Sequence, residues 1–150
     1  MTSIAMNDFM KGADHDELRP VFVYGTLMST RLLVGLLTGD ERDTNIIESI
    51  RESATLHGYS RRAVRGADYP AVVKTDPKDK VDGFLVHPRT LEDLKMLDHF
   101  ENESYCRELV EVINYINQKT IAYVYVWCDN IEDLADSDWS LEEFEARWFR

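Results

Sequence analysis

The sequence predicts one α+β domain in which helices pack on a mixed sheet. Its 150 residues match the commonest size of a single domain, and a chain of this length buries enough surface to fold without disulfides or a structural metal. Hydrophobic residues make up 44% of the chain and charged residues 30%, as in ordinary globular proteins. The expected elements run strand, helix, several strands, helix, two strands. This order is neither a regular βαβ alternation nor an all-β pattern.

The chain begins with a segment that has no periodic apolar face. Residues 1–18 are polar and acidic, so we expect a loosely ordered arm in front of a domain at 19–150. Residues 21–24 are β-branched or aromatic and stop at Gly25, which predicts a buried strand that enters a tight turn.

The first predicted helix begins after this turn. Ser29 or Thr30 can cap it, and Gly39 ends it. Four leucines fall on one face of this helix: Leu32, Leu33, Leu36 and Leu37. Residues 40–52 are charged and fit either a surface loop or one short helix.

The middle and the end of the chain are rich in strand signals. Strands are expected at 55–59, 69–73 and 81–86, separated by Gly, Asp and Pro. Two further strands, near 107–113 and 120–127, are predicted to form a hairpin.

Two more helices are predicted from their caps. Thr90 and Asp93 resemble a capping box at the start of a helix that continues to Phe100. Ser140 can cap a short amphipathic helix that closes the chain, with Phe144 on its apolar face.

The charge balance argues against two classes of partner. The chain has 17 Lys and Arg against 28 Asp and Glu, a net charge of −11 that repels phosphate backbones and anionic lipid headgroups. We therefore expect binding neither to nucleic acid nor to a membrane surface.

No apolar run approaches the roughly 20 residues that span a bilayer, and the first residues lack the pattern of a secretion signal. A cytoplasmic location is expected.

The cysteines and histidines do not have the spacing of a metal site. Cys106 and Cys128 lie far apart in strand-like stretches, where we expect buried free thiols and neither a disulfide framework nor a zinc site. A metal site built from the remaining candidates would lack helical His spacing, so we expect hydrogen-bonded or solvated histidines. These candidates are His87, Asp98, His99 and Glu101. No cofactor is predicted.

The first candidate for chemistry is the turn at residues 24–29. Backbone N–H groups at a junction between a strand and a helix, with the positive end of the helix dipole, can hold a carboxylate or a phosphate. Gly25 would let the backbone approach such a ligand. An ordinary turn explains the same spacing, because a single glycine in a turn is common.

The second candidate is Glu101, which follows Leu94 and Leu97 at helical spacing. On a continuing helix its carboxylate would lie in line with the apolar stripe. Desolvation and the helix dipole would then raise its pKa toward the range of a general acid/base. In the alternative, the helix ends at Phe100 or Asn102 and Glu101 faces water.

A small basic cluster lies beside Tyr59. Arg61, Arg62 and Arg65 either orient an anionic substrate or keep a strand edge soluble, and we favour the edge role.

Taken together, these segments resemble the γ-glutamylcyclotransferase-like family, and more closely its plant- and fungal-type AIG2-like branch. The matching pieces run in family order over about residues 20–128. They are VFVYGTL at 21–27, GY at 58–59, DYPA at 68–71, VDG at 81–83, LDHFE at 97–101 with Tyr105 and Arg107, and AYVYVW at 122–127. Asn102 departs from the family, which often has glycine there.

The resemblance implies a small mixed β-barrel with flanking helices in the order β-α-β-β-α-β-β. It implies that Glu101 is the proton acceptor in the cyclisation of a γ-glutamyl amide or peptide to 5-oxoproline. It also implies a substrate loop that comprises Tyr24, Gly25, Thr26, Leu27, Met28 and Ser29. Three aromatic residues are candidates for the pocket wall, although core packing explains them equally well: Tyr69, Tyr105 and Trp127. The alternative function is a small-ligand-binding module of the same fold without turnover.

Overall fold

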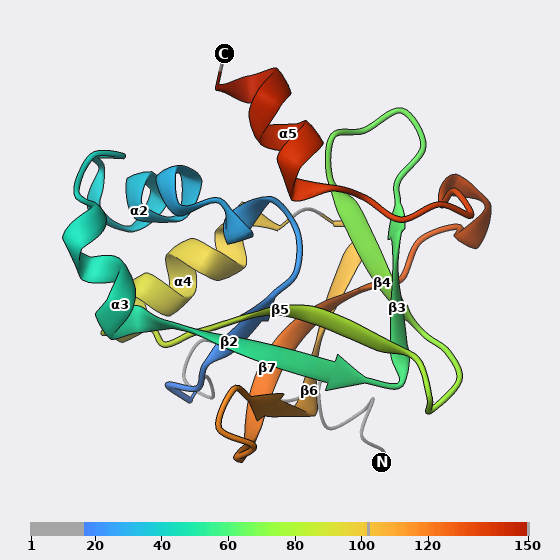
Figure 1. Ribbon diagram of the computed structural model, residues 1–150, viewed down its shortest axis with the longest axis horizontal. Helices are drawn as coiled ribbons and strands as arrows, with labels where there is room; N and C mark the ends of the chain where they lie inside the picture. Colours follow the sequence, from blue (N-terminus) through green and yellow to red (C-terminus); the bar gives the residue numbers. More distant parts are fainter. Residues whose placement is uncertain (1–16, 102, 150) are drawn as a thin grey trace.

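Five strands close into a barrel whose order is β1-β5-β2-β6-β7 (Figure 1). The computed structural model describes residues 17–101 and 103–149, so most of the predicted arm, as well as Asn102, lies outside the described residues. The barrel strands are β1 (Val21–Val23), β2 (Arg51–His57), β5 (Lys80–Val86), β6 (Tyr105–Asn114) and β7 (Lys119–Trp127). The predicted mixed α+β fold and its barrel are confirmed.

The barrel is mixed because of the way β1 joins it. This strand pairs antiparallel with β5, with Val21 opposite Val86, and parallel with β7, with Val21 opposite Tyr123. The other barrel pairs are antiparallel. A Cβ atom at Gly83 would overlap the Val23 carbonyl oxygen, so the approach of β5 to β1 requires glycine there.

A second, two-stranded sheet consists of β3 (Tyr59–Ala63) and β4 (Pro70–Lys74). The predicted strand at 55–59 has the wrong bounds, because the chain turns at Gly58, where φ is 88°, and β2 and β3 belong to different sheets. The segment after β7 runs along β3. Val64 forms a bridge with Leu134, and the Ala63 N–H donates to the Ser137 carbonyl at 2.9 Å.

The helices begin and end at the residues that local chemistry favours. Ser29 caps α2 (Thr30–Thr38), which ends at Gly39 with φ 82°. The Thr90 and Ser140 side chains accept from the third following amide and cap α4 (Leu91–Phe100) and α5 (Leu141–Trp148). The remaining helical pieces are η2 (Thr26–Met28), η3 (Thr44–Ile46), α3 (Ile47–Ile50) and η4 (Ile131–Asp133).

Segment 40–52, for which the sequence left two possibilities, forms η3, α3 and the start of β2. Figure 1 shows α2, α3 and α4 together on one side of the barrel and the β3–β4 sheet on the other. Within the described ranges, no helix has the length and apolar content needed to cross a membrane.

Two apolar clusters meet along β1. Phe22 points into the barrel interior with Leu85 and Val124, whereas Val21 and Val23 pack under the helices. Alternation along a strand therefore anchors β1 on both faces. The loop that follows β1 consequently starts from an immobilised strand end.

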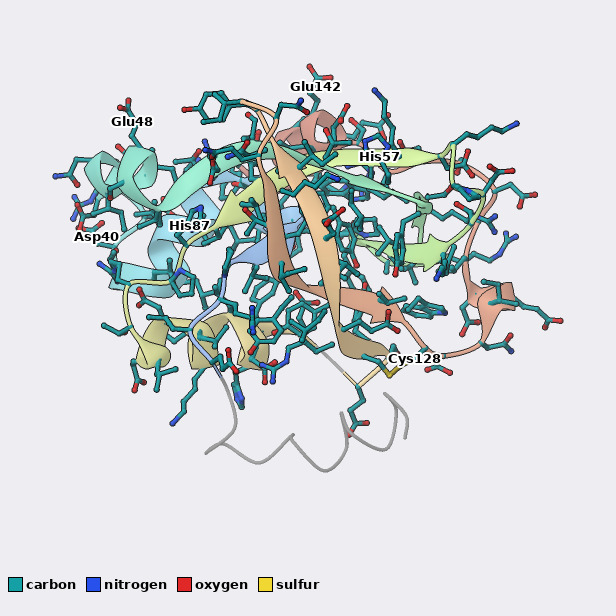
Figure 2. All side chains as sticks on the ribbon, turned by 90° about the horizontal axis from the view of Figure 1, so that it is seen from below. Asp40, Glu48, His57, His87, Cys128 and Glu142 are labelled. Carbon is teal, nitrogen blue, oxygen red and sulfur yellow. A yellow bond between two sulfur atoms is a disulfide. The ribbon has the colours of Figure 1, made fainter. Side chains whose placement is uncertain are left out.

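The cysteines contradict the prediction of buried free thiols. Cys106 and Cys128 form a disulfide with a Cα–Cα distance of 5.9 Å, and both residues are exposed. Figure 2 shows Cys128 at the edge of the molecule. The apolar strand pattern misled the prediction because Val124 and Val126, on the same strand face, are buried inside the barrel, whereas Cys128 lies beyond its end.

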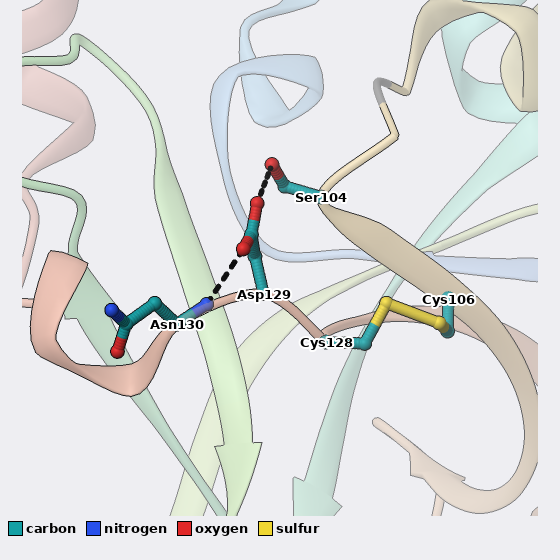
Figure 3. Close-up of a disulfide and its surroundings, with 5 residues drawn as sticks. All are labelled: Ser104, Cys106, Cys128, Asp129 and Asn130. Atoms are coloured by element: carbon teal, nitrogen blue, oxygen red, sulfur yellow. Dashed lines mark hydrogen bonds between the residues drawn. A yellow bond between two sulfur atoms is a disulfide. The ribbon is translucent and has the colours of Figure 1, made fainter.

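Polar contacts lie next to the disulfide, where the chain leaves Cys128 (Figure 3). The Ser104 hydroxyl donates to Asp129 at 3.0 Å, and the Asn130 N–H donates to the same carboxylate at 2.8 Å. The Cys128 N–H donates to the Ser104 carbonyl at 2.9 Å. Because disulfides are rare in reducing compartments, this pair does not support the expected cytoplasmic location.

Candidate active site

A cavity of about 160 Å³ lies where the loop after β1 meets the end of α4 and the start of β6. Most of the residues selected from the sequence line it: Tyr24, Gly25, Thr26, Leu27, Tyr69, Glu101 and Tyr105. Pro70, Leu97, Phe100 and Tyr125 complete the wall, together with β1. The fold therefore brings the loop and Glu101 together from distant parts of the sequence.

Two residues of the predicted substrate loop lie elsewhere. Met28 is buried in the cluster between the barrel and the helices. Ser29 accepts a hydrogen bond from the Leu32 N–H at 3.4 Å and caps α2. Neither lines the cavity, so the part of the loop that faces it is residues 24–27.

Glu101 is the first residue after α4, with φ −80° and ψ 148°. The helix thus ends at Phe100, as in the alternative derived from the sequence, yet the side chain lines the cavity. Burial, and secondarily the charge of Asp98, raises the pKa of Glu101 to about 7. Among the described residues none donates a hydrogen bond to its carboxylate. The carboxylate is therefore available to a ligand.

Neutral phenols surround Glu101. The Tyr24 hydroxyl donates to the Tyr125 carbonyl, the Tyr105 hydroxyl to the Pro70 carbonyl and the Tyr125 hydroxyl to Asp98, each at 2.6 Å. Burial raises the pKa of each of these tyrosines, so none of them supplies charge at neutral pH. In the described part of the chain, no cationic side chain lines the cavity.

The other two aromatic candidates take different places. Tyr69 is 37% exposed and lies at the cavity with its ring 6.4 Å from that of Tyr105. Trp127 does not line the cavity. Its ring packs edge-on behind Tyr105 at 5.4 Å, and its indole N–H donates to the Asn130 carbonyl at 2.9 Å. Core packing therefore accounts for Trp127.

Gly25 brings the loop close to Pro70. Its φ is −124°, so the turn requires no left-handed backbone there. A Cβ atom would instead lie 2.8 Å from Cδ and 2.9 Å from Cγ of Pro70, which is itself part of the cavity wall. Any larger side chain would move that wall.

The loop also leaves backbone donors at the cavity. The Met28 N–H donates to the Gly25 carbonyl at 2.9 Å, and the Ser29 N–H donates to the Thr26 carbonyl at 3.0 Å. Within the described residues, the amides of Gly25, Thr26 and Leu27 have no acceptor. Three consecutive amides of this kind are suited to a carboxylate or an oxyanion.

Arg61 contacts the loop, a role that the sequence did not reveal. Its Nη1 donates to the Tyr24 carbonyl at 2.9 Å, while Nε and Nη2 donate to Asp138 at 2.7 and 3.1 Å. Its side chain is 18% exposed. Because Asp138 is 77 positions away along the chain, no local pattern could have identified this pairing.

The three histidines that the structure describes, His57, His87 and His99, do not gather around one point. His87 Nε2 lies 2.6 Å from Glu52 Oε2, and Figure 2 shows His57 far from His87. His99 is exposed on α4. In residues 17–101 and 103–149, no three His, Cys, Asp or Glu side chains lie together as metal ligands would.

Residues 21–141 match the family model described as gamma-glutamyl cyclotransferase, AIG2-like. The chain belongs to this family. The resemblance inferred from the sequence motifs is thus confirmed.

Relatives of the AIG2-like family cover most of the chain. It is 31% identical to AIG2-like protein D of Arabidopsis thaliana over 130 residues, which is 85% of this chain and 80% of that protein. Protein AIG2 C of the same plant is 29% identical over 127 residues, 84% of this chain and 72% of that protein.

Solved structures share the AIG2-like fold. A solution structure of an Arabidopsis thaliana protein superimposes with a TM-score of 0.64 at 27% identity, over 88% of this chain and 75% of that chain. A structure described as a gamma-glutamyl cyclotransferase superimposes with a TM-score of 0.53 at 16% identity, over 74% and 67% of the two chains. The latter likeness shows the fold alone.

Proposed function

We propose that this AIG2-like protein is a γ-glutamylcyclotransferase, which converts a γ-glutamyl amide or peptide to 5-oxoproline and releases the amine. One observation carries the proposal. Glu101, with a pKa of about 7, shares a cavity with the loop amides of residues 25–27. A base that is half ionised near neutral pH and an anion-binding loop together match the needs of this cyclisation.

The reaction requires no covalent residue from the protein. The α-amine of the substrate attacks its own γ-carbonyl carbon, the new C–N bond closes a five-membered ring, and the old amide C–N bond breaks. The protein contributes by folding the substrate back on itself. A well-oriented intramolecular attack of this kind can lower the barrier by roughly 7–11 kcal/mol.

Glu101 handles the protons. The substrate's α-ammonium must lose a proton before its nitrogen can attack, and the Glu101 carboxylate accepts it. As the tetrahedral intermediate collapses, the protonated carboxyl gives its proton to the departing nitrogen, so the amine leaves neutral. The regenerated carboxylate then accepts the second proton of the ring nitrogen, which becomes the amide N–H of 5-oxoproline, and passes that proton to solvent. A pKa near the working pH lets the same group serve as base and then as acid.

The loop amides bind the negatively charged groups of the substrate and of the intermediate. The N–H groups of Gly25, Thr26 and Leu27 can bind the α-carboxylate of the substrate or the oxyanion that develops on its γ-carbonyl. Tyr69 and Tyr105 offer an apolar wall for the rest of the ligand. This scheme requires neither a metal ion nor a nucleotide.

The test is formation of 5-oxoproline from a panel of γ-glutamyl amines, γ-glutamyl amino acids and γ-glutamyl peptides. We expect the wild-type chain to release it from at least one class. Glu101→Gln should lower kcat by about 10²-fold or more, because the amide keeps the shape of the carboxyl group and removes the base. Glu103→Gln, at an exposed neighbouring position, is the matched control and should keep wild-type activity.

Two results would contradict this function. Activity of Glu101→Gln within a few-fold of wild type would remove Glu101 from proton transfer. Binding of 5-oxoproline without turnover of any compound in the panel would instead indicate a ligand-binding module of the same fold.

A further inference from the structure

Arg61 lies behind the loop and is held there on several sides. It comes from β3, and its guanidinium joins the Tyr24 carbonyl to the Asp138 carboxylate. Asp138 is itself placed by the segment that runs along β3, since the Ser137 carbonyl accepts from the Ala63 N–H at 2.9 Å. The Trp139 indole donates to the Asp68 carbonyl at 2.7 Å and anchors the same segment.

The carbonyl that Arg61 contacts belongs to the peptide unit between Tyr24 and Gly25. The described part of the chain has no cis peptide bond, so the Gly25 N–H points away from the Tyr24 carbonyl and hence away from Arg61. Gly25 lines the cavity, and its N–H has no acceptor among the described residues. Arg61 thus binds the carbonyl oxygen of a peptide unit whose N–H, that of Gly25, has no acceptor among the described residues.

A cation on a carbonyl oxygen also changes the strength of that donor. Hydrogen bonds polarise one another through a peptide unit, so a charged donor at the oxygen makes the N–H a better donor. The effect matters in a chain with a net charge of −11 and in a cavity whose lining supplies no cationic side chain among the described residues. An anionic ligand would otherwise meet an unfavourable potential.

We propose that Arg61 is a positioning residue for the binding of a carboxylate by the loop amides of residues 25–27. Through the Tyr24–Gly25 peptide it orients the Gly25 N–H and makes this group a stronger hydrogen-bond donor to a carboxylate-bearing ligand. The inference rests on the proposed function in one respect, because it takes the ligand to be a γ-glutamyl compound or its product. Arg61 acts through the loop and does not touch the reacting atoms.

The experiment compares two probes that differ in charge. 5-Oxoproline carries the carboxylate, whereas 5-oxoprolinamide has the same ring and a neutral amide. Titration calorimetry on the full chain should show that Arg61→Met weakens 5-oxoproline binding by roughly tenfold or more, the scale of one charge-assisted hydrogen bond. Binding of 5-oxoprolinamide should change by less than about threefold, since the neutral amide gains less from the oriented donor.

Two further variants distinguish orientation of the Gly25 N–H by Arg61 from a contribution of Arg61 to the stability of the fold alone. Arg61→Lys keeps the charge but not the forked geometry, so it should fall between wild type and Arg61→Met. Asp138→Asn removes the ion pair and leaves the contact between Nη1 and Tyr24, so its preference for the charged probe should remain. Circular dichroism must show that each variant is folded.

A measurement on wild type guards against a variant that does not fold. In an NMR titration, the Gly25 amide proton should move downfield on addition of 5-oxoproline and much less with 5-oxoprolinamide. The inference is overturned if this proton does not respond, if Arg61→Met weakens both probes equally, or if neither probe binds wild type. A wild type that shows the Arg61-dependent preference but forms no 5-oxoproline from the panel would uphold the inference and refute the proposed function.

Discussion

Glu101 stands where α4 has just ended, and its extended backbone turns the side chain into the cavity. The pKa of this group, about 7, has a consequence for folding as well as for chemistry. In the unfolded chain the carboxyl ionises near its ordinary value of 4.5. The folded state therefore binds the proton more tightly, and the free energy of unfolding falls as the pH rises from about 4.5 to about 7.

Glu101→Gln should therefore stabilise the protein in a pH-dependent way. The amide carries no charge to bury, so we expect a gain of roughly 2–3 kcal/mol at pH 8 that shrinks to about 1 kcal/mol or less at pH 5. Urea denaturation at the two pH values measures it. Glu111→Gln, at an exposed position of β6, should show the same small effect at both. A gain that is independent of pH would show that burial of charge is not its cause.

At the scale of elements, the β6–β7 hairpin is defined at both ends. Its turn is organised by Asn114, whose side chain accepts from the Ile116 N–H at 3.2 Å and the Gln118 N–H at 2.8 Å. Asn117 takes the left-handed backbone there, with φ 66°. At the open end, Tyr105 pairs with Trp127, and the disulfide joins Cys106, which pairs with Val126, to Cys128, which follows β7. The hairpin therefore supports the wall of the cavity through Tyr105.

Replacing both cysteines with serine should destabilise the domain by about 2–4 kcal/mol, because the disulfide restricts the unfolded chain across 22 positions. Denaturation midpoints with and without reductant measure the loss. The single variant Cys106→Ser is the matched control and should lose as much as the double variant, since neither can form the bond. Midpoints that do not respond to reductant, in a chain whose mass shows free thiols, would contradict the disulfide.

At the scale of the whole molecule, closure of the barrel depends on a short strand. β1 has three residues, yet it joins β5 to β7 and separates the two apolar clusters. Its Val23 carbonyl faces Gly83 of β5 so closely that no Cβ atom fits between them. The same strand leads into residues 24–27, which line the cavity, so the closure of the barrel and the shape of the cavity are coupled.

Gly83→Ala tests this closure. We expect a loss of about 2 kcal/mol or more, since the added methyl group must displace backbone. Gly35→Ala is the matched control because its Cβ would meet nothing closer than 3.5 Å. In the interior of α2 that change should stabilise by roughly 0.5–1 kcal/mol. Thermal and urea denaturation measure the free energy of unfolding of both variants. Similar values for the two would show that β1 and β5 can move apart without loss of stability.

The sequence by itself determined the features that depend on neighbouring residues. Ser29, Thr90 and Ser140 cap helices, and Gly39 ends one, because each acts on amides or carbonyls within a few positions. The hairpin at β6–β7 followed from strand alternation and a turn for the same reason. Glu101 and the loop were identified as candidates from local spacing and from family motifs.

The tertiary structure decided everything that joins distant segments. It placed Glu101 in the cavity although the helix had ended, paired Arg61 with Asp138 behind the loop, and joined Cys106 to Cys128. It also removed Met28 and Ser29 from the cavity wall. Local propensity acts within a turn or a strand, whereas these contacts arise only when the barrel closes, because burial and charge pairing depend on which remote residues arrive at the same place.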